Sequence, residues 1–301
     1  MVEKNLSPSH KDSSFFIQGN IFSHFKDRTA VLATKHGKER AIAPVLWESL
    51  GLRLTVSDKI DTDTFGTFAG DVERPASQFE TAAIKATNCL ALHPEAGLAL
   101  ASEGAFYPHP EVPFLTMNTE IVLLMGREPS LTIAGYHHST ETLATSEEIA
   151  TTEELLDFAN RLKFPEFGLI LKVKTGEKHA IKKDLNSLAS LLDAFRSLRS
   201  EHEKITVETD LRAHRNPLRM KMIGQAAADL VRRILATCPN CGYPDFVVKD
   251  FEKGLPCELC SLPTRLPLKD IKACGYCGFR EEILFPKGEK AYAGHCDWCN
   301  P

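Results

Sequence analysis

Eight of the nine cysteines in this 301-residue chain stand in four Cys-x-x-Cys pairs within its last 64 residues. Two thiolates on one tight turn supply half of a tetrahedral zinc site, and a second pair completes it. Fifteen residues separate the first two pairs and eighteen the last two, as in four-cysteine zinc sites. We therefore expect two structural zinc ions, each held by consecutive pairs because shorter loops cost less entropy to close. The expected ligand sets are Cys238, Cys241, Cys257 and Cys260, and Cys274, Cys277, Cys296 and Cys299.

Two polar segments follow apolar runs that have the composition of strands. ATKHGKERAI (33–42) places Lys38 between a predicted strand and a predicted helix, where backbone amides and lysines favour an anion such as phosphate. A solvated basic turn is the alternative. ASEGAF (101–106) places Glu103 after a buried strand, at the end where α/β sheets bind ligands. A generic surface acid is the alternative for Glu103.

A run of acids lies between these two segments. DTDTFGTFAGDVER (61–74) contains Asp61, Asp63, Asp71 and Glu73. Carboxylates that fold onto one cavity bind a hard cation such as Mg²⁺. Acidic loops that face water are the alternative.

The most basic stretch of the chain covers residues 211–236, with six Lys and Arg residues and one acid. ETDLRAHRNPLRM (208–220) turns there from a predicted strand into a helix that Asn216 and Pro217 open. Arginine forks at a helix N-terminus suit phosphate or an acidic partner. In the alternative interpretation, Asn216 only caps the helix and the arginines pair with acids of the cysteine-rich region. The expected substrate contacts of this segment are Arg212, His214 and Arg219.

Apolar runs and helical patterns alternate along the rest of the chain, which predicts an α/β fold with a mixed sheet and flanking helices. Three prolines and a glycine predict an irregular loop over 103–114. Strands are expected at 29–34, 52–56, 98–102, 120–125, 131–137, 168–173 and 204–208. Helices are expected over 39–51, from Ser77 with Glu80 in capping-box spacing, from Thr151 with Glu154 likewise, over 184–199 and over 217–236. The helix after Ser77 is expected to present Phe79, Ala83, Ala86 and Leu90 on one face.

Composition divides the chain into four parts. Residues 1–20 are polar and serine-rich, so we expect a disordered tail. The α/β domain is expected over 21–210 and a connecting basic helix over 211–236. Two small four-cysteine zinc modules are expected over 237–301.

The charge balance limits the partners of the protein. The chain has 36 Lys and Arg against 40 Asp and Glu, and the cysteine-rich region 238–301 has eight basic and nine acidic residues even before thiolates are counted. DNA is therefore not an expected partner. No apolar run reaches the length of a membrane helix, and the N-terminus has no apolar signal region. We expect a cytoplasmic protein without a membrane partner.

The sequence resembles two known families. The stretch 29–125, with a strand ending in Ala-Thr, a lysine-bearing turn, the helix FETAAIKA (79–86) and an acidic strand end, is similar to nucleoside triphosphate pyrophosphatases of the inosine triphosphatase and Maf type. The entire chain resembles a bacterial family of unknown function, through ATKHGKE, DTDTFGTF, ASEGAF, ETDLRAHRNPLRM and cysteine modules that resemble tandem zinc ribbons. The first resemblance implies that Thr34, His36 and Lys38 face a triphosphate and that Glu80 and Glu103 hold Mg²⁺.

Two functions of different classes follow from these residues. The first is a Mg²⁺-dependent phosphohydrolase that acts on a nucleotide-like, phosphate-bearing small molecule. The second is a non-enzymatic adaptor whose zinc modules dock a protein or RNA partner. The enzyme would use Lys38, Glu80 and Glu103 as catalytic residues and Thr34, His36, Arg212, His214 and Arg219 as substrate-binding residues.

Overall fold

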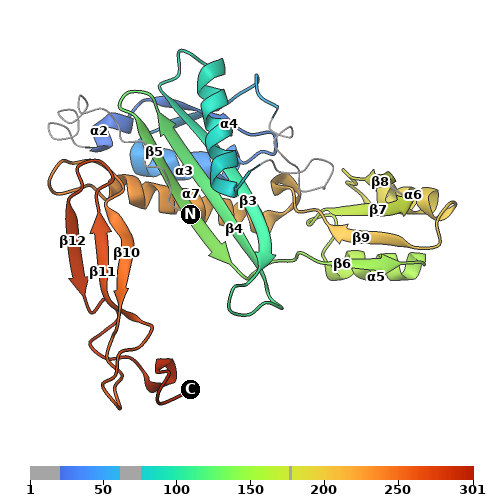
Figure 1. Ribbon diagram of the computed structural model, residues 1–301. Coiled ribbons are helices and arrows are strands. Elements are labelled where there is room, and N and C mark those ends of the chain that lie inside the picture. The colour runs from blue at the N-terminus through green and yellow to red at the C-terminus, as the bar shows by residue number, and fades with distance from the viewer. Residues whose placement is uncertain (1–20, 62–75, 176–177) are drawn as a thin grey trace. The chain divides into compact units, whose positions relative to one another are not determined.

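The computed structural model describes residues 21–61, 76–175 and 178–301 (Figure 1). Contacts between Cα atoms divide the chain into two compact units. One unit spans Asp27–Val231, and the other joins the described residues before Asp27 to Arg232–Pro301. The domain boundaries that the sequence places at residues 210 and 236 stay predictions.

A mixed five-stranded sheet with the order β2-β1-β3-β4-β5 forms the first half of the larger unit (Figure 1). Its β2-β1-β3 part is parallel and its β3-β4-β5 part is antiparallel, as expected of a mixed sheet. The strands are β1 (Thr29–Ala33), β2 (Arg53–Val56), β3 (Leu98–Pro108), β4 (Thr116–Gly126) and β5 (Leu131–Ser139).

Helices cover both faces of this sheet. Successive residues of a strand point to opposite faces. On β4, Ile121 and Leu123 join the buried cluster that contains Ala82 and Ala86 of α4, whereas Glu120 contacts α7. The helices of this part are α3 (Glu39–Leu50), α4 (Gln78–Leu92) and α7 (Pro217–Leu235). Among the described residues, no helix combines the length and apolarity that a membrane crossing requires.

Local capping signals predicted three helix starts correctly, whereas α6 (Leu188–Arg199), expected from residue 184, begins after the N-cap residue Ser187. The Ser77 hydroxyl accepts a hydrogen bond from the Glu80 amide while the Glu80 carboxylate accepts one from the Ser77 amide, which confirms the capping box of α4. Thr151 and Glu154 cap α5 (Thr152–Arg161) in the same way. Asn216 Oδ1 accepts a hydrogen bond from the Arg219 amide at 3.1 Å at the start of α7.

Two expectations, one about β3 and one about α4, were wrong. The segment 103–114 is not irregular throughout, because β3 continues to Pro108 and pairs with β4 over its full length. Pairing with a long neighbour outweighs the weak strand propensity of Gly104. The buried face of α4 is also different, since Phe79 is exposed and Ala83 only partly buried. The buried positions of α4 are Thr81, Ala82, Lys85, Ala86, Cys89 and Leu90.

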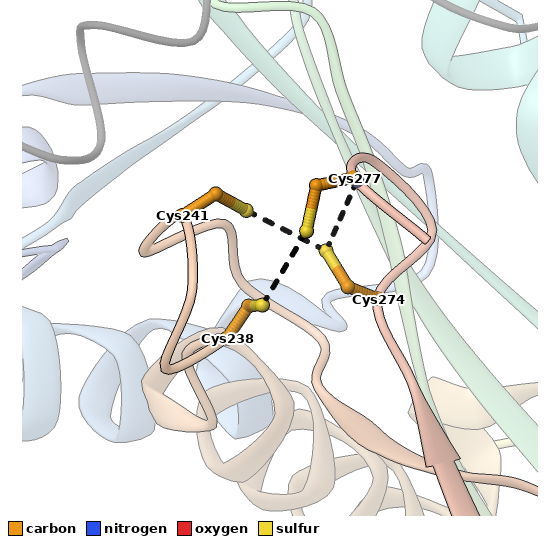
Figure 2. A group of neighbouring side chains, drawn as sticks. All are labelled: Cys238, Cys241, Cys274 and Cys277. Carbon is orange, nitrogen blue, oxygen red and sulfur yellow. Dashed lines mark hydrogen bonds between the residues drawn. The ribbon is translucent and has the colours of Figure 1, made fainter. Parts of the chain in front are cut away.

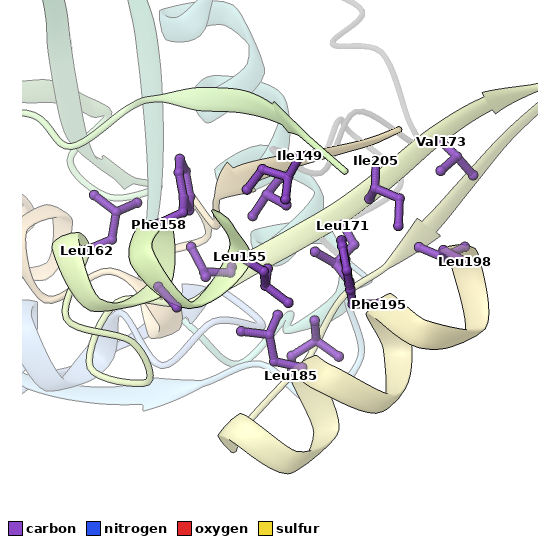
Figure 3. Close-up of a cluster of buried hydrophobic side chains, with 14 residues drawn as sticks. Ile149, Leu155, Phe158, Leu162, Leu171, Val173, Leu185, Phe195, Leu198 and Ile205 are labelled. Carbon is purple, nitrogen blue, oxygen red and sulfur yellow. The ribbon is translucent and has the colours of Figure 1, made fainter. Parts of the chain in front are cut away.

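A second sheet, with the order β6-β9-β7-β8, follows in the same unit. All its pairings are antiparallel, and the four-residue β6 and the five-residue β8 are not expected from the sequence. Fourteen buried side chains, centred on Leu155, Phe158, Leu171 and Phe195, fill the space between this sheet and two helices (Figure 3). The elements are β6 (Ser146–Ile149), α5, β7 (Leu169–Thr175), β8 (Lys178–Lys182), α6 (Leu188–Arg199) and β9 (Ile205–Thr209).

The smaller unit contains a three-stranded antiparallel sheet, β10-β11-β12. Its middle strand is partly exposed along its whole length and its edge strands are largely exposed. A sheet this thin buries too little apolar surface to be stable alone. The elements of this unit are α2 (Ile21–Phe25), β10 (Val247–Lys253), β11 (Pro267–Ala273), β12 (Arg280–Leu284) and η4 (Ala293–His295).

The close approach of α7 to β5 generates a stability prediction. A Cβ atom at Gly135 would overlap the backbone of Ala226 and Leu230. We expect Gly135→Ala to lower the free energy of unfolding of the larger unit by about 1–3 kcal/mol, measured by urea denaturation. Gly224→Ala is the matched control, because its Cβ would lie 3.5 Å from the nearest atom, the Ala41 carbonyl oxygen, and should stabilise α7 by up to about 1 kcal/mol. Equal effects of the two changes would contradict this packing.

Candidate functional site

The turn between β1 and α3 places a lysine in the interior. Gly37 has a φ of 66°, which lets the chain reverse into α3 directly after β1. Lys38 is the N-cap residue of α3, and its side chain makes no capping hydrogen bond. Instead its Nζ donates to the Ser102 carbonyl oxygen at 2.7 Å and lies 3.5 Å from Ser102 Oγ. Because β1 and β3 are parallel and β3 continues beyond β1, Lys38 reaches β3 just past the end of β1.

Two buried ion pairs flank this lysine. On the α4 side, Lys85 Nζ donates to Glu103 Oε1, and both side chains are buried. On the α7 side, Arg219 donates to both carboxylate oxygens of Glu120, at 2.7 and 3.0 Å. Neighbouring positions on a strand face opposite sides, and Glu120 pairs in register with Gly104 rather than Glu103. The two ion pairs therefore lie on opposite faces of β3 and β4.

The cluster of Lys38, Lys85, Glu103, Glu120 and Arg219, which we call the charged cluster, carries three cations and two carboxylates. Burial lowers the pKa of Lys38 to about 8, while the negative charge of Glu103 raises it and the positive charge of Arg219 lowers it. The Lys38 ammonium is thus only partly stabilised by the acids around it. An additional negative group would favour its charged form.

Glycine allows the second ion pair to form. A Cβ atom at Gly104 would overlap the guanidinium of Arg219 and lie 2.8 Å from the Glu120 carboxylate oxygens. The absence of a side chain lets Arg219 extend across β3 to Glu120. The same guanidinium lies 5.7 Å from the ring centre of Phe106 and also donates to the Leu211 carbonyl oxygen.

Two segments that the sequence singled out separately meet beside the charged cluster. The imidazoles of His36 and His214 stack with ring centres 4.9 Å apart. Thr34 is buried, and its hydroxyl accepts a hydrogen bond from the His36 amide at 3.3 Å. Partial burial and the positive charge of Arg212 lower the pKa of His214, so this ring is neutral near pH 7. The turn after β1 and the turn before α7 therefore share one surface.

Arg212 is occupied by acids rather than exposed to a ligand. Its guanidinium bonds Asp210 at 2.6–3.2 Å and Asp184 at 2.8 Å. Although burial acts in the opposite direction, these hydrogen bonds and charges raise the pKa of Arg212. Asp210 is completely buried and depends on this pairing. Arg212 and Arg219 pair with acids, as the alternative interpretation of this segment expected. These acids belong to the larger unit, however, and not to the cysteine-rich region.

Glu80 lies away from the charged cluster. Its carboxylate accepts hydrogen bonds from the Ser77 amide and hydroxyl at 3.0 and 2.7 Å, and these bonds lower its pKa. Asp61 forms an ion pair with Lys35 at 2.7 Å. The other acids of that segment lie outside the described residues; they are Asp63, Asp71 and Glu73. Of the segments expected to converge, the structure thus brings together 34–38 and Glu103, but not Glu80.

Sequence reasoning missed Lys85 and Glu120. Lys85 lies three residues after Ala82 and one before Ala86, so it belongs to the buried stripe of α4, where a lysine needs an acid. Glu120 alternates with Val122 and Leu124 on one face of β4. In both cases a charged residue recurs at the spacing of buried apolar residues, which indicates a buried charge that needs a partner.

A chain of hydrogen bonds crosses the same sheet near Glu103. Thr119 Oγ1 lies 2.7 Å from the Tyr107 hydroxyl and 2.8 Å from His138 Nδ1. Gln78, the first residue of α4, donates to the carbonyl oxygens of Glu103 and Thr119 at 2.9 and 2.8 Å. These bonds connect the α4 N-terminus, β3, β4 and β5, and among them only the side chains of Tyr107, Thr119 and His138 can exchange protons.

The eight paired cysteines form two clusters, but the predicted pairing was wrong. In the first cluster the four side chains point toward one another (Figure 2). Sulfur–sulfur distances are 3.6 and 3.7 Å in the first cluster and 3.6 and 3.9 Å in the second. A tetrahedron with Zn–S bonds of ~2.3 Å has edges of about 3.8 Å, so both clusters fit zinc. The clusters are Cys238, Cys241, Cys274 and Cys277, and Cys257, Cys260, Cys296 and Cys299.

The sheet explains the interleaved pairing. Each strand leads from one cluster toward the other, so consecutive Cys-x-x-Cys turns fall at opposite ends of the sheet. Joining Cys241 to Cys274 rather than Cys257 doubles the closed loop, which costs only about 0.6 kcal/mol. The ladders of β10, β11 and β12 outweigh this cost.

Two double variants distinguish interleaved from sequential pairing. Cys238→Ser/Cys274→Ser removes ligands from one interleaved cluster, so we expect half of the bound metal to remain. Cys238→Ser/Cys257→Ser removes a ligand from each cluster, so we expect nearly all metal to be lost. If the pairing were sequential, the first double variant would lose nearly all of its metal and the second would keep half. Metal content measured by plasma emission spectrometry after gel filtration decides between them.

Comparison with known proteins adds a family. A family described as Domain of unknown function (DUF6671) matches residues 87–301, which begin within α4 and include both cysteine clusters. No curated protein matches the chain. The family match covers well over half of the sequence, including Glu103, Glu120 and Arg219. The chain therefore belongs to the DUF6671 family.

Proposed function

We propose that this protein is a phosphate-recognising hydrolase that acts on a nucleotide-like small molecule at the turn between β1 and α3. The observation that carries the proposal is the buried Lys38 ammonium at the α3 N-terminus, beside two carboxylates and two further cations. β1 and its parallel ladder with β3 end there, at Ala33 and Ala101, although β3 itself continues to Pro108, and the carboxyl edge of parallel strands is the usual ligand position in α/β sheets.

Electrostatics of the turn favour an anion. The Lys38 side chain does not cap α3. Although the amides of Arg40 and Ala41 donate to carbonyl oxygens within the turn, the dipole of the helix favours a negative group at its N-terminus. The charged cluster has one more cation than acid. Lys38 would contact a phosphate oxygen, and Thr34 and His36 would form the adjoining part of the site.

Glu103 is the residue best placed for the hydrolytic step. Its carboxylate is buried near Lys38, on the face of the sheet that also carries Thr119. A Mg²⁺ ion would need Glu103 to exchange Lys85 for the metal, because Lys85 occupies its carboxylate. Glu80 has no part in this proposal, since its carboxylate caps α4.

The two cysteine clusters are proposed to hold structural zinc. Each offers four thiolates at tetrahedral spacing, which fills the coordination shell and leaves no position for a reacting group. The small sheet between them has little core of its own. Zinc would therefore supply much of the folding free energy of this unit.

An adaptor is the second candidate function. Large apolar side chains such as Leu259 and Trp298 are exposed on the smaller unit. A protein partner fits this surface better than RNA, because residues 238–301 carry nine acids against eight bases and the zinc-bound thiolates add negative charge.

The pH dependence of binding tests the role of Lys38. Anion binding favours the ammonium, so affinity for a phosphate monoester such as methyl phosphate should fall as Lys38 loses its proton. The affinity should reach about half of its low-pH value near pH 8, the pKa of Lys38, and then fall by up to tenfold per pH unit. Calorimetric titration with methyl phosphate between about pH 7.5 and 9.5 measures this, because the second pKa of a phosphate monoester, about 6, keeps its charge near −2 over that range. Lys38→Met should abolish the dependence, and Lys182→Ala, an exposed lysine of β8, should preserve it. A flat profile in the parent protein would contradict a phosphate at Lys38.

Removal of Glu103 tests the hydrolytic step. Glu103→Gln alone leaves Lys85 buried without an acid and should cost about 3–5 kcal/mol of stability, so Glu103→Gln/Lys85→Met is the informative variant. We expect this double variant to fold and to lose at least about 100-fold in turnover of nucleoside phosphates. Assays with and without added Mg²⁺ or Mn²⁺ show whether a metal is used. Undiminished turnover in the folded double variant would exclude Glu103 from catalysis.

A further inference from the structure

Four large apolar side chains are exposed around the second cysteine cluster. Leu259 and Trp298 directly precede the ligands Cys260 and Cys299, and their exposed fractions are 73% and 77%. Tyr292 is 70% exposed and Leu262 42% exposed. We call these four residues the knuckle surface; they are Leu259, Leu262, Tyr292 and Trp298.

The knuckle surface is held in place by short-range contacts. The Glu258 amide donates to the Ala291 carbonyl oxygen at 2.9 Å, and the Ala293 amide donates to Glu258 Oε1 at 3.0 Å, which joins the Tyr292 segment to the Leu259 turn. An ion pair of 2.9 Å between Arg265 and Asp297 braces the turn that carries Trp298. Side chains on such braced turns lose little additional freedom when a partner binds.

Charge around the knuckle surface favours a protein over a nucleic acid as its partner. The segments 254–266 and 285–301 contain three basic and three acidic side chains. A single-stranded nucleic acid needs a cationic groove beside its stacking aromatics, and these segments provide no excess of cations. A second copy of this chain has the same side-chain balance, and because the four thiolates of a zinc-loaded cluster add a formal −2 to each copy, apolar burial rather than charge pairing has to hold the two copies together.

The apolar area is sufficient for a weak dimer. From their exposed fractions, the four side chains offer roughly 500 Å² per copy. Two copies would bury about 1,000 Å², the lower limit for a specific interface. An interface at this limit leaves little surplus over the cost of association, so we expect a weak dimer with a dissociation constant of roughly 10–100 µM.

We propose that the knuckle surface is a self-association site, at which two copies of the chain form a symmetric dimer. In a two-fold arrangement the same patch meets itself, so the flat ring of Trp298 can lie on the aliphatic Leu259 of the other copy. Apolar burial drives this association, and salt should weaken it little.

Sedimentation equilibrium of the full chain from about 1 to 500 µM tests the proposal, since this range brackets the expected dissociation constant. We expect a monomer–dimer equilibrium whose dissociation constant changes less than about threefold between low and high salt. Trp298→Ala/Leu259→Ala should raise that constant at least tenfold while the metal content stays unchanged. Phe114→Ala removes another exposed apolar side chain, 87% exposed in the β3–β4 loop, and should have no effect.

Fluorescence supplies a second measurement. The chain has two tryptophans, so Trp47→Phe leaves Trp298 as the only one. Its emission should shift to shorter wavelength with concentration, over the same range as dimer formation. A monomer at all concentrations, a dimer that survives the double variant, or emission that responds to oligouridylate but not to protein concentration would each overturn the proposal.

Discussion

Charge removed from water must be neutralised at close range, and this requirement determines how three helices pack on the first sheet. Moving an ion into the interior costs several kcal/mol unless an opposite charge is close. Each helix contributes one cation to β3 and β4: α3 contributes Lys38, α4 contributes Lys85 and α7 contributes Arg219. Rotation of any helix by one residue would leave a buried ion without its partner. The charged cluster thus fixes the helix orientations that apolar contacts alone leave less defined.

The smaller unit cannot rely on buried side chains for its stability. Its sheet has water on both sides and gains little from apolar burial. The cysteine clusters lie at the two ends of β10, β11 and β12, where bound metal would hold the strands together in place of a core.

The sequence was informative wherever the signal is local. Helix starts follow from one side chain and the next few amides, and for this reason Ser77, Thr151 and Asn216 were recognised. The cysteine ligands were also recognisable as a set, because two thiolates on one turn are a local feature. Which turns share a metal is not local, since it depends on the direction of the strands between them.

The candidate site was only partly predictable for the same reason. Lys38 follows β1 as predicted, but Glu103 lies inside β3 rather than after a strand, and it is the acid that Lys85 needs, eighteen residues away. Because this acid could not be identified from the sequence, Lys85 was taken to face solvent. The buried face of α4 was therefore predicted to include Phe79 and Ala83 instead. Similarly, β3 extends beyond Glu103 because β4 lies beside it, and no short segment of sequence contains that information.

Interleaved cysteine pairing has a consequence for the order of events during synthesis. With sequential pairing, the first site would be complete once Cys260 had left the ribosome. In this structure the turn of Cys238 and Cys241 waits for Cys277, and the turn of Cys257 and Cys260 waits for Cys299. Four thiols, those of Cys238, Cys241, Cys257 and Cys260, are therefore present on the nascent chain before the other ligands of their sites have been synthesised. Until the last cysteines are synthesised, the fold cannot protect these thiols from oxidation or from binding other metal ions, so their protection depends on the surroundings of the nascent chain.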